Sequence, residues 1–475
     1  MNVLLVTGED HGPDFGCYGD PYARTPRVDA FAEESLRFTN AYVTQAVCSP
    51  GRASILTGLY PHQNGQIALA SHHHRMFRDF PTIPKLLSDT GFRTGRIGKL
   101  HILPEEASPF DMVWNPKEHW SFNNRDVHRM AGVARDFFAD SEQPFFLMAN
   151  FPDAHLPWLP QACGLPESPL VADDVQAPPD VGVQSERLRA QIADYYNCLE
   201  RLDTGFGLLL DALAASGKAE NTVVIYITDH GPQFSRGKCC VNELALRAPL
   251  LVRWPGVTSG GTVRPDLVSQ IDVLPTVMDA AGITPPAGLP GRSLRPLAAT
   301  GPVAWRETIA AEWHASGSTQ VHMLYNPQRA IRDARYKLIH NLRPDVPNPV
   351  ESYYTQQTMI ASGSNQEEID ATTPEMQAVY ARWRDQPEWE LFDLQEDPHE
   401  ITDLAASPEH QDTLARMQGL LRDWQAETAD PLANPALLAR LNTDMDRIAA
   451  IPGSPAKDPD FHWPYLDYLA PITRA

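Results

Sequence analysis

The stretch AVCSPGRASILTG, residues 46–58, is the part of the sequence around which the rest of the chain is organised. A polar pair precedes Pro50 and good helix formers follow it, so we predict a short helix that begins at Cys48 or Ser49. That helix would place Cys48 at the positive end of its dipole, with Arg52 four residues on along the same face. Backbone N–H groups, a helix dipole and a guanidinium together suit a nucleophile that works beside an oxyanion. The alternative is a buried structural cysteine beside a surface arginine.

The composition sets limits on the class of protein. The chain has 475 residues, enough for two domains or for one large core with an appendage. Its formal net charge of −21 argues against a nucleic-acid partner, which needs a basic footprint, but it leaves room for a locally basic site. The sequence has no run of about 18 consecutive apolar residues, so we expect no membrane-spanning helix and no membrane partner.

The N-terminus and the cysteines bear on the compartment. The chain runs from Met1 directly into an apolar stretch, without a basic region or a cleavage site. We therefore expect a cytoplasmic protein, or a periplasmic one whose signal was removed. The six cysteines, two of them adjacent at Cys239 and Cys240, form no regular framework and favour a reducing compartment.

Acidic residues follow two apolar runs, 3–7 and 222–228, that are typical of strands buried on both faces. An open α/β sheet binds its ligands beyond the carboxyl ends of its strands, so we expect the two loops to meet over the sheet. Carboxylate oxygens suit Ca²⁺ or Mg²⁺, whereas histidine is a weak calcium ligand that could instead hydrogen-bond a substrate. The alternative is a pair of solvated turns. The candidate metal ligands are Glu9, Asp10, Asp229 and His230.

Basic side chains follow two further predicted strands, at 93–98 and 144–150. Residues two apart in an extended segment face the same way, so Lys99 and His101 can address one site together. His155 lies in a proline-flanked loop at a strand end, from which it could act as a general acid. The alternative for all three is an ordinary surface or loop residue.

The order of these motifs resembles that of the type I, formylglycine-dependent sulfatases. The shared motifs are Cys-x-Pro-x-Arg at 48–52, Lys-x-His at 99–101, Asp-His at 229–230 and Gly-Lys at 237–238. Segments 48–54, 59–65, 337–342 and 389–400 are similar to members of this family that act on N-sulfated glucosamine. Three positions depart from the pattern of those members: Glu9 replaces an aspartate, His230 an asparagine and Lys238 an arginine.

The resemblance implies both a fold and a mechanism. The fold would be α/β and alkaline-phosphatase-like, with a large, mostly parallel central sheet flanked by helices and a small C-terminal antiparallel sheet. A formylglycine-generating maturation enzyme would oxidise Cys48, and one hydroxyl of the hydrated aldehyde would attack sulfur. A divalent cation, Ca²⁺ or alternatively Mg²⁺, would bind a sulfate oxygen. The remaining roles would be charge balance by Arg52, Lys99 and Lys238, protonation of the leaving group by His155, and His101 as a candidate base.

The sequence pattern divides the chain in two. Apolar positions that recur every three or four residues predict a long helix at 185–216, either continuous or interrupted near Gly205. We predict a catalytic domain at 1–318 and a C-terminal α+β subdomain at 319–475. The subdomain has hairpin strands at 329–332 and 336–340, a third strand at 389–394, and a helix at 411–427. The proline- and aromatic-rich tail after Asp430 is expected to wrap over the surface or a partner subunit, which leaves a homodimer open.

Three more histidines are candidate substrate contacts. His72 and His74 belong to a triple histidine, which cannot turn all three rings toward one transition-metal ion, so we place them on a loop at the pocket rim. His314 follows a predicted strand at 308–313. The alternative for each is a plain loop histidine.

We therefore expect a sulfatase that removes sulfate from a sulfated sugar, either N-sulfoglucosamine or a related saccharide derived from a glycosaminoglycan. One alternative is an O-sulfate ester sulfatase that acts on aryl or other carbohydrate sulfates. Another is a phosphodiesterase or phosphonate hydrolase with the same nucleophile. The third is a non-catalytic binder of sulfated glycans.

Overall fold

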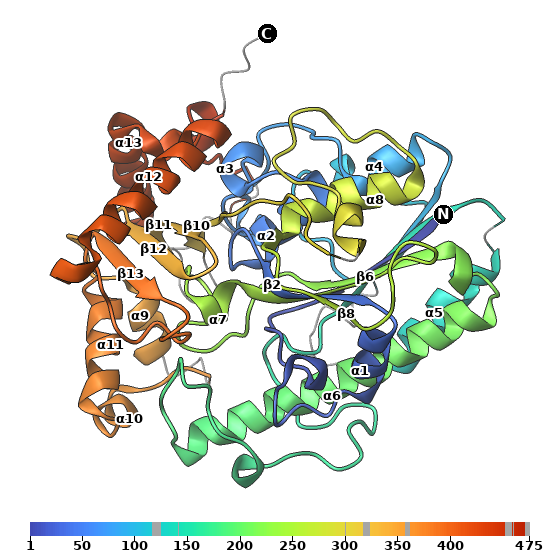
Figure 1. The fold of residues 1–475 in the computed structure, drawn as a ribbon, viewed down its shortest axis with the longest axis horizontal. Coiled ribbons are helices and arrows are strands. Elements are labelled where there is room, and N and C mark those ends of the chain that lie inside the picture. Colours follow the sequence, from blue (N-terminus) through green and yellow to red (C-terminus); the bar gives the residue numbers. More distant parts are fainter. Residues whose placement is uncertain are drawn as a thin grey trace.

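The computed structural model describes residues 1–115, 125–140, 142–299, 301–316, 324–356, 362–451, 458 and 460–470. Its largest element is a nine-stranded sheet in the order β4-β3-β5-β1-β6-β7-β2-β8, with β9 also paired to β2 (Figure 1). The strands are β1 Asn2–Gly8, β2 Leu36–Tyr42, β3 Arg93–Ile97, β4 Met112–Trp114, β5 Phe145–Phe151, β6 Thr222–Thr228, β7 Arg247–Arg253, β8 Thr262–Arg264 and β9 Val268–Ser269.

The sheet is mostly parallel, as predicted. Among the described strand pairs of this large sheet, only those that β7 makes with β6 and β2 are antiparallel. Every residue of β1 is buried. Val3 and Leu5 pack in one hydrophobic core, whereas Leu4 and Val6 pack in the other, as expected for a strand covered on both faces.

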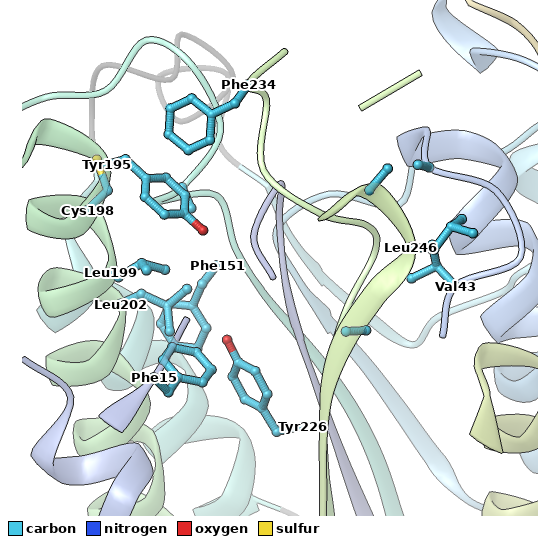
Figure 2. Close-up of a cluster of buried hydrophobic side chains, with 14 of the residues drawn as sticks. Phe15, Val43, Phe151, Tyr195, Cys198, Leu199, Leu202, Tyr226, Phe234 and Leu246 are labelled. Carbon is cyan, nitrogen blue, oxygen red and sulfur yellow. The ribbon is translucent and has the colours of Figure 1, made fainter. Parts of the chain in front are cut away.

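Helices cover both faces of this sheet (Figure 1). One face carries α1 (Pro26–Glu33), α5 (Val127–Asp140) and α6 (Glu186–Ala215), and the other carries α2 (Cys48–Thr57), α4 (Ile83–Ser88) and α8 (Val273–Ala281). Figure 2 shows Leu199 and Leu202 of α6 beside Phe15, Phe151 and Tyr226 in the first of these cores.

The long helix α6 is continuous, which decides between the two predicted forms. Gly205 lies inside this helix. A Cβ at this position would stand 2.7 Å from side-chain atoms of Phe151 and Val127, so only glycine fits without a shift. The glycine therefore permits close packing of α6 on β5 and α5, and it does not interrupt the helix. None of the helices in the described part of the chain is long and apolar enough to cross a membrane.

A second, antiparallel sheet follows, as predicted, but it has four strands where three were expected, in the order β10-β11-β12-β13. Its strands are β10 Ile309–Ser316, β11 Leu324–Arg332, β12 Tyr336–Asn341 and β13 Trp389–Asp393. Helix α12 (Gln411–Thr428) packs on one face, and α9 (Pro349–Thr355) and α11 (Pro374–Arg384) pack on the other. The remaining helices are α3 Pro61–Asn64, α7 Glu243–Leu246, α10 Gln366–Asp370 and α13 Pro435–Ala449.

The small sheet begins earlier in the chain than its predicted hairpin strands. Strand β10 belongs to it and ends at Ser316, ahead of the predicted division between residues 318 and 319. That division lies outside the described residues, and the partition into two domains stays a prediction. All six cysteines are unpaired.

Candidate active site

The nucleophile candidate opens helix α2, as predicted. The helix runs Cys48–Thr57, all of its residues are buried, and Gly58 ends it in the left-handed conformation with φ of 69°. A Cβ at Gly51 would lie 2.6 Å from the carbonyl oxygen of Asp229. Glycine at this position therefore allows the loop after β6 to contact the first turn of α2.

The thiol of Cys48 lies among charged side chains. Its Sγ is 3.4 Å from Nε2 of His230, 3.7 Å from Oδ1 of Asp10 and 3.9 Å from Nζ of Lys238. Burial would raise the pKa of Cys48, but Lys238, Lys99 and His230 outweigh it and hold that pKa well below its usual value. The surroundings therefore stabilise an anion at residue 48.

The two acidic loops meet, as predicted. Strands β1 and β6 are parallel neighbours that end in register, with Gly8 opposite Thr228. The amide of Asp10 donates to Oδ1 of Asp229 at 3.1 Å. The adjacent carboxylate of Glu9 is also fully buried. Three buried carboxylates thus converge from two loops that lie far apart in the sequence.

Each of these carboxylates contacts a basic side chain. Lys99 Nζ is 2.7 Å from Oε2 of Glu9, Lys238 Nζ is 2.6 Å from Oδ2 of Asp10, and Arg52 Nε is 3.1 Å from Oδ2 of Asp229. The cluster is therefore a dense alternation of positive and negative groups, which a buried site needs because unpaired charges there are costly.

The cluster fits a divalent cation. Candidate ligand atoms of Asp10, Cys48, Asp229 and His230 lie within 4.8 Å of one another, as do those of Glu9, Asp10 and His155. Oε1 of Glu9 is buried and has no hydrogen-bond partner among the described residues, although Nη2 of Arg52 lies 3.4 Å away. Carboxylate oxygens are the ligands that Ca²⁺ and Mg²⁺ prefer.

The hydrogen bonding of His230 also suits a ligand. Its Nδ1 donates to the carbonyl of Gly231 at 2.8 Å, and its Nε2 lies 3.2 Å from Oδ1 of Asp10. A second hydrogen bond of this kind orients the ring of many metal-binding histidines.

The charges around the site shift the pKa values of Glu9 and His230 in opposite directions, and each shift favours the charged form of its group. Burial would raise the pKa of Glu9, but Lys99 and Arg52 lower it to about 2. Burial would lower the pKa of His230, but Asp229 and Asp10 raise it to about 9.

His101 differs from His230 in its surroundings. Burial lowers its pKa to about 4, although a hydrogen bond with Cys48 opposes the shift. The imidazole of His101 is therefore neutral at pH 7 and can accept a proton beside residue 48.

The backbone around the site is held in uncommon conformations. Asp10, His101, Arg236 and Cys239 have φ between 50° and 64°, the left-handed region that side chains other than glycine rarely adopt. Asp10 and His101 are themselves candidate site residues, and the other two flank Lys238. Backbone strain of this kind clusters at functional sites.

Two of the three candidate histidines, His72 and His74, pack against the chain's C-terminal segment. The ring of His74 stacks on Trp463 with centroids 3.8 Å apart, and the carbonyl of His72 accepts from the Trp463 indole at 2.8 Å. His314 is fully buried, 3.5 Å from Glu312. Substrate contact by these histidines therefore stays a prediction, and the tail packs on a loop of its own chain.

Two polar residues that the sequence did not single out support the site. Gln270 donates to the carbonyl of Asp229 at 2.7 Å. Asn150, at the end of β5, accepts from the amide of Lys99 at 3.2 Å and donates to the carbonyl of Thr7 at 3.1 Å. A buried amide at the carboxyl end of a central strand was the available signal for Asn150, whereas Gln270 acts through contacts that the sequence does not reveal.

The fold and this cluster define a hydrolase of the sulfatase class, and the comparisons agree. Residues 1–283 match the family described as Sulfatase, so the chain belongs to the sulfatase family. Residues 235–358 match the family described as N-sulphoglucosamine sulphohydrolase, C-terminal. Human N-sulphoglucosamine sulphohydrolase is 32% identical over 470 residues, which cover 90% of this chain and 91% of the human protein. The predicted resemblance is confirmed.

Solved structures confirm the fold. A complex with D-glucosamine-2-N,6-O-disulfate as substrate superposes with a TM-score of 0.67 at 20% identity, over 90% of this chain and 98% of the other. The phosphonate monoester hydrolase of Agrobacterium radiobacter superposes with a TM-score of 0.65 at 20% identity, over 90% and 95%.

Proposed function

We propose that this sulfatase cleaves the S–N bond of an N-sulfated glucosamine, or the corresponding bond of a related saccharide derived from a glycosaminoglycan. The observation that carries the proposal is the convergence of Cys48 with three carboxylates and a set of basic side chains in one buried cluster. The name of the human relative and the description matched by residues 235–358 support the choice of sugar.

Two groups complete the proposed site. Formylglycine, made from Cys48 by a maturation enzyme, supplies a hydrated aldehyde whose hydroxyl is the nucleophile toward sulfur. A divalent cation, Ca²⁺ in our first choice and Mg²⁺ in our second, supplies Lewis-acid polarisation of the sulfate. Glu9, Asp10, Asp229 and His230 would hold it.

The chain's own residues supply the rest of the chemistry. Arg52, Lys99 and Lys238 balance the charge that develops on the sulfate oxygens. The neutral imidazole of His101 accepts a proton beside residue 48, and His155 delivers one to the leaving nitrogen. Overall, one S–N bond is broken, one water is consumed, and sulfate and the free amine leave.

A substrate panel tests the choice of bond. The purified enzyme, produced together with a maturation enzyme, is given N-sulfoglucosamine, 2-O- and 6-O-sulfated monosaccharides, an aryl sulfate and an aryl phosphodiester. We expect the highest kcat/KM for N-sulfoglucosamine. A preference for an O-sulfate would move the assignment to an ester sulfatase, and a preference for the phosphodiester would move it to a phosphohydrolase.

The nucleophile has its own test. Cys48→Ser should lose turnover by several orders of magnitude, because serine cannot be matured to the aldehyde by a cysteine-specific enzyme, while the melting temperature stays close to wild type. Mass spectrometry of the peptide that contains residue 48 should show the aldehyde in the wild-type protein. Activity of the serine variant at the wild-type level would eliminate the mechanism. Light scattering of the same samples tests whether the protein is a homodimer, which the sequence left open.

A further inference from the structure

We propose that Arg125 is a positioning residue, which holds the His155 loop in the orientation that proton transfer to the leaving group requires. The inference deepens the proposed function and rests on it, because His155 is the general acid of that proposal. No sequence motif marks Arg125, and its role follows from the hydrogen bonds it makes.

Arg125 directs its guanidinium into one short loop. The residue is 1% exposed and lies two positions before α5. It donates to the carbonyl oxygens of Pro152 at 2.6 Å, His155 at 2.8 Å and Pro157 at 3.1 Å, and also to that of Asp153. A single side chain thus bonds four backbone carbonyls within six consecutive residues.

Most of these carbonyls need the guanidinium because the loop makes no regular structure. Only that of Pro152 also accepts from a backbone amide, that of His155 at 3.1 Å, among the described residues. Residues 152–157 belong to neither a helix nor a strand. The two carbonyls that Arg125 does not reach are bonded within the same region: that of Ala154 accepts from the Trp158 indole at 2.6 Å, and that of Leu156 accepts from the ring of His155 at 2.6 Å. Every carbonyl of the loop is therefore satisfied, and Arg125 satisfies most of them.

The orientation of the imidazole depends on this loop. Because Nδ1 of His155 donates to the carbonyl of Leu156, proton transfer to the substrate would go through Nε2. Candidate ligand atoms of Glu9, Asp10 and His155 lie within 4.8 Å of one another. A shift of the loop backbone would therefore carry the ring away from the carboxylate cluster, and the proton donor would be misplaced.

A lysine could not substitute for this arginine. Guanidinium has five N–H donors in a planar fork, whereas an ammonium has three donors at one point. Carbonyls that spread from Pro152 to Pro157 cannot all converge on a single nitrogen. Arg125→Lys therefore keeps the charge and much of the volume but loses most of the hydrogen bonds.

A second arginine holds the other side of this segment. Arg201 of α6 is fully buried and donates to Oδ1 of Asp153 at 2.5 Å and to the carbonyl of Leu159 at 3.3 Å. Among the described residues, Arg201 bonds neither the carbonyl of His155 nor that of Pro157, so it anchors the segment at Asp153 and Leu159, on either side of the part that Arg125 holds. Arg125 is the group bonded directly at His155.

The experiment measures how turnover depends on the leaving group. Arg125→Gln, Arg125→Lys and His155→Gln are compared with wild type on a series of substituted phenyl sulfates, from acidic to weakly acidic phenols. A good leaving group needs no proton, so loss of a general acid slows only the poor ones. For the poorest leaving group we expect kcat to fall roughly 10²- to 10⁴-fold in His155→Gln and about 10- to 100-fold in the Arg125 variants. With 4-nitrophenyl sulfate the fall should stay within about threefold.

A matched control separates positioning from general destabilisation. Arg382 also donates to two loop carbonyls, those of Glu400 and Ile401 at 3.0 Å each, but it lies in the small-sheet region. Arg382→Gln should leave the dependence on the leaving group unchanged. The double variant Arg125→Gln/His155→Gln should be no slower than His155→Gln alone, because the two changes remove one function.

Each other outcome would overturn the proposal in an identifiable way. A uniform loss across the phenyl series in both Arg125 variants, or an additive double variant, would make Arg125 a purely structural residue. If His155→Gln lowered kcat equally for good and poor leaving groups, His155 would not be the general acid, and Arg125 would have no proton donor to position. Absence of N-sulfoglucosamine turnover by the matured wild-type enzyme would overturn the proposed function itself, whatever the phenyl series shows.

Discussion

At the scale of single residues, the motif around the nucleophile combines chemistry with a packing requirement. Cys48 and Arg52 carry functional groups, but Gly51 between them is there for space. The loop after β6 passes so close to the first turn of α2 that a methyl group would meet the carbonyl oxygen of Asp229 at 2.6 Å. The short Cys-x-Pro-x-Arg pattern therefore encodes the approach of two loops as well as the reacting group.

Gly51→Ala should damage the site more than the fold. We expect a loss of about 1–3 kcal/mol of stability from the forced backbone shift, and turnover about 100-fold lower because Asp229 moves away from residue 48. Thermal unfolding and kcat together check this. The control is Gly132→Ala in α5, where a Cβ meets nothing within 4 Å, so the helix should gain about 0.5–1 kcal/mol with unchanged kcat. Equal effects of the two substitutions would contradict the packing argument.

Residue types in a recognisable order were enough to predict most of the cluster. Cys48, Asp10 and Asp229 converge because strand ends that follow apolar runs lie at one edge of a parallel sheet. The contacts of Arg125 could not be predicted in this way. An arginine that bonds backbone carbonyls leaves no pattern in the sequence, because any residue supplies a carbonyl.

At the scale of elements, sequence periodicity predicted the bounds of single strands and helices but not which strands pair with one another. The strand at 222–228 has the predicted bounds, and the predicted helix at 411–427 is α12, Gln411–Thr428. Strand β10 was also predicted, but its place in the small sheet was not. The reason is that a strand pattern does not report which other strand it pairs with, and β10 pairs with β11.

The C-terminal segment 460–470 is the element whose role the sequence left most open. Trp463 is 1% exposed, stacks on His74 and bonds the carbonyl of His72. The histidine loop in turn contacts the nucleophile helix, since the amide of Ala70 donates to Oγ of Ser49 at 2.9 Å. The segment therefore supports a loop that leads directly to the start of α2.

Trp463→Ala should loosen that loop. Removal of a buried indole costs about 3–5 kcal/mol, which thermal unfolding will report. If His72 or His74 contacts substrate, KM for the sulfated sugar should rise more than kcat falls, because binding is lost and the nucleophile is intact. Tyr468→Phe is the control in the same segment, since it removes a hydrogen bond to Asp444 at 2.9 Å and should cost at most about 1.5 kcal/mol. A Trp463→Ala enzyme with unchanged KM would place both histidines outside the substrate site.

At the scale of the whole molecule, the two sheets are joined by buried charges. Glu243 of α7 accepts from the hydroxyl of Tyr42 in β2 at 2.7 Å, and it lies 3.2 Å from Arg332 of β11 and 3.0 Å from Lys337 of β12. Lys337 also contacts Glu400 at 2.7 Å. A single carboxylate therefore connects β2 of the large sheet to two strands of the small one.

This junction makes the stability of the whole chain depend on pH in a defined direction. Burial would raise the pKa of Glu243, but Lys337 and Arg332 lower it from 4.5 to about 2. A carboxyl whose pKa is lower in the folded state stabilises that state above pH 4.5 and loses this contribution as the pH falls toward 2. The contribution at neutral pH is on the order of 3 kcal/mol.

Glu243→Gln should therefore lower the free energy of unfolding at pH 7 by at least this amount, and the difference from wild type should shrink steadily below pH 4.5. Urea unfolding between pH 2 and 7 measures it, with the exposed Glu367→Gln as the control that should run parallel to wild type. A constant offset between Glu243→Gln and wild type across this range would mean that Glu243 joins the two sheets by shape and not by charge.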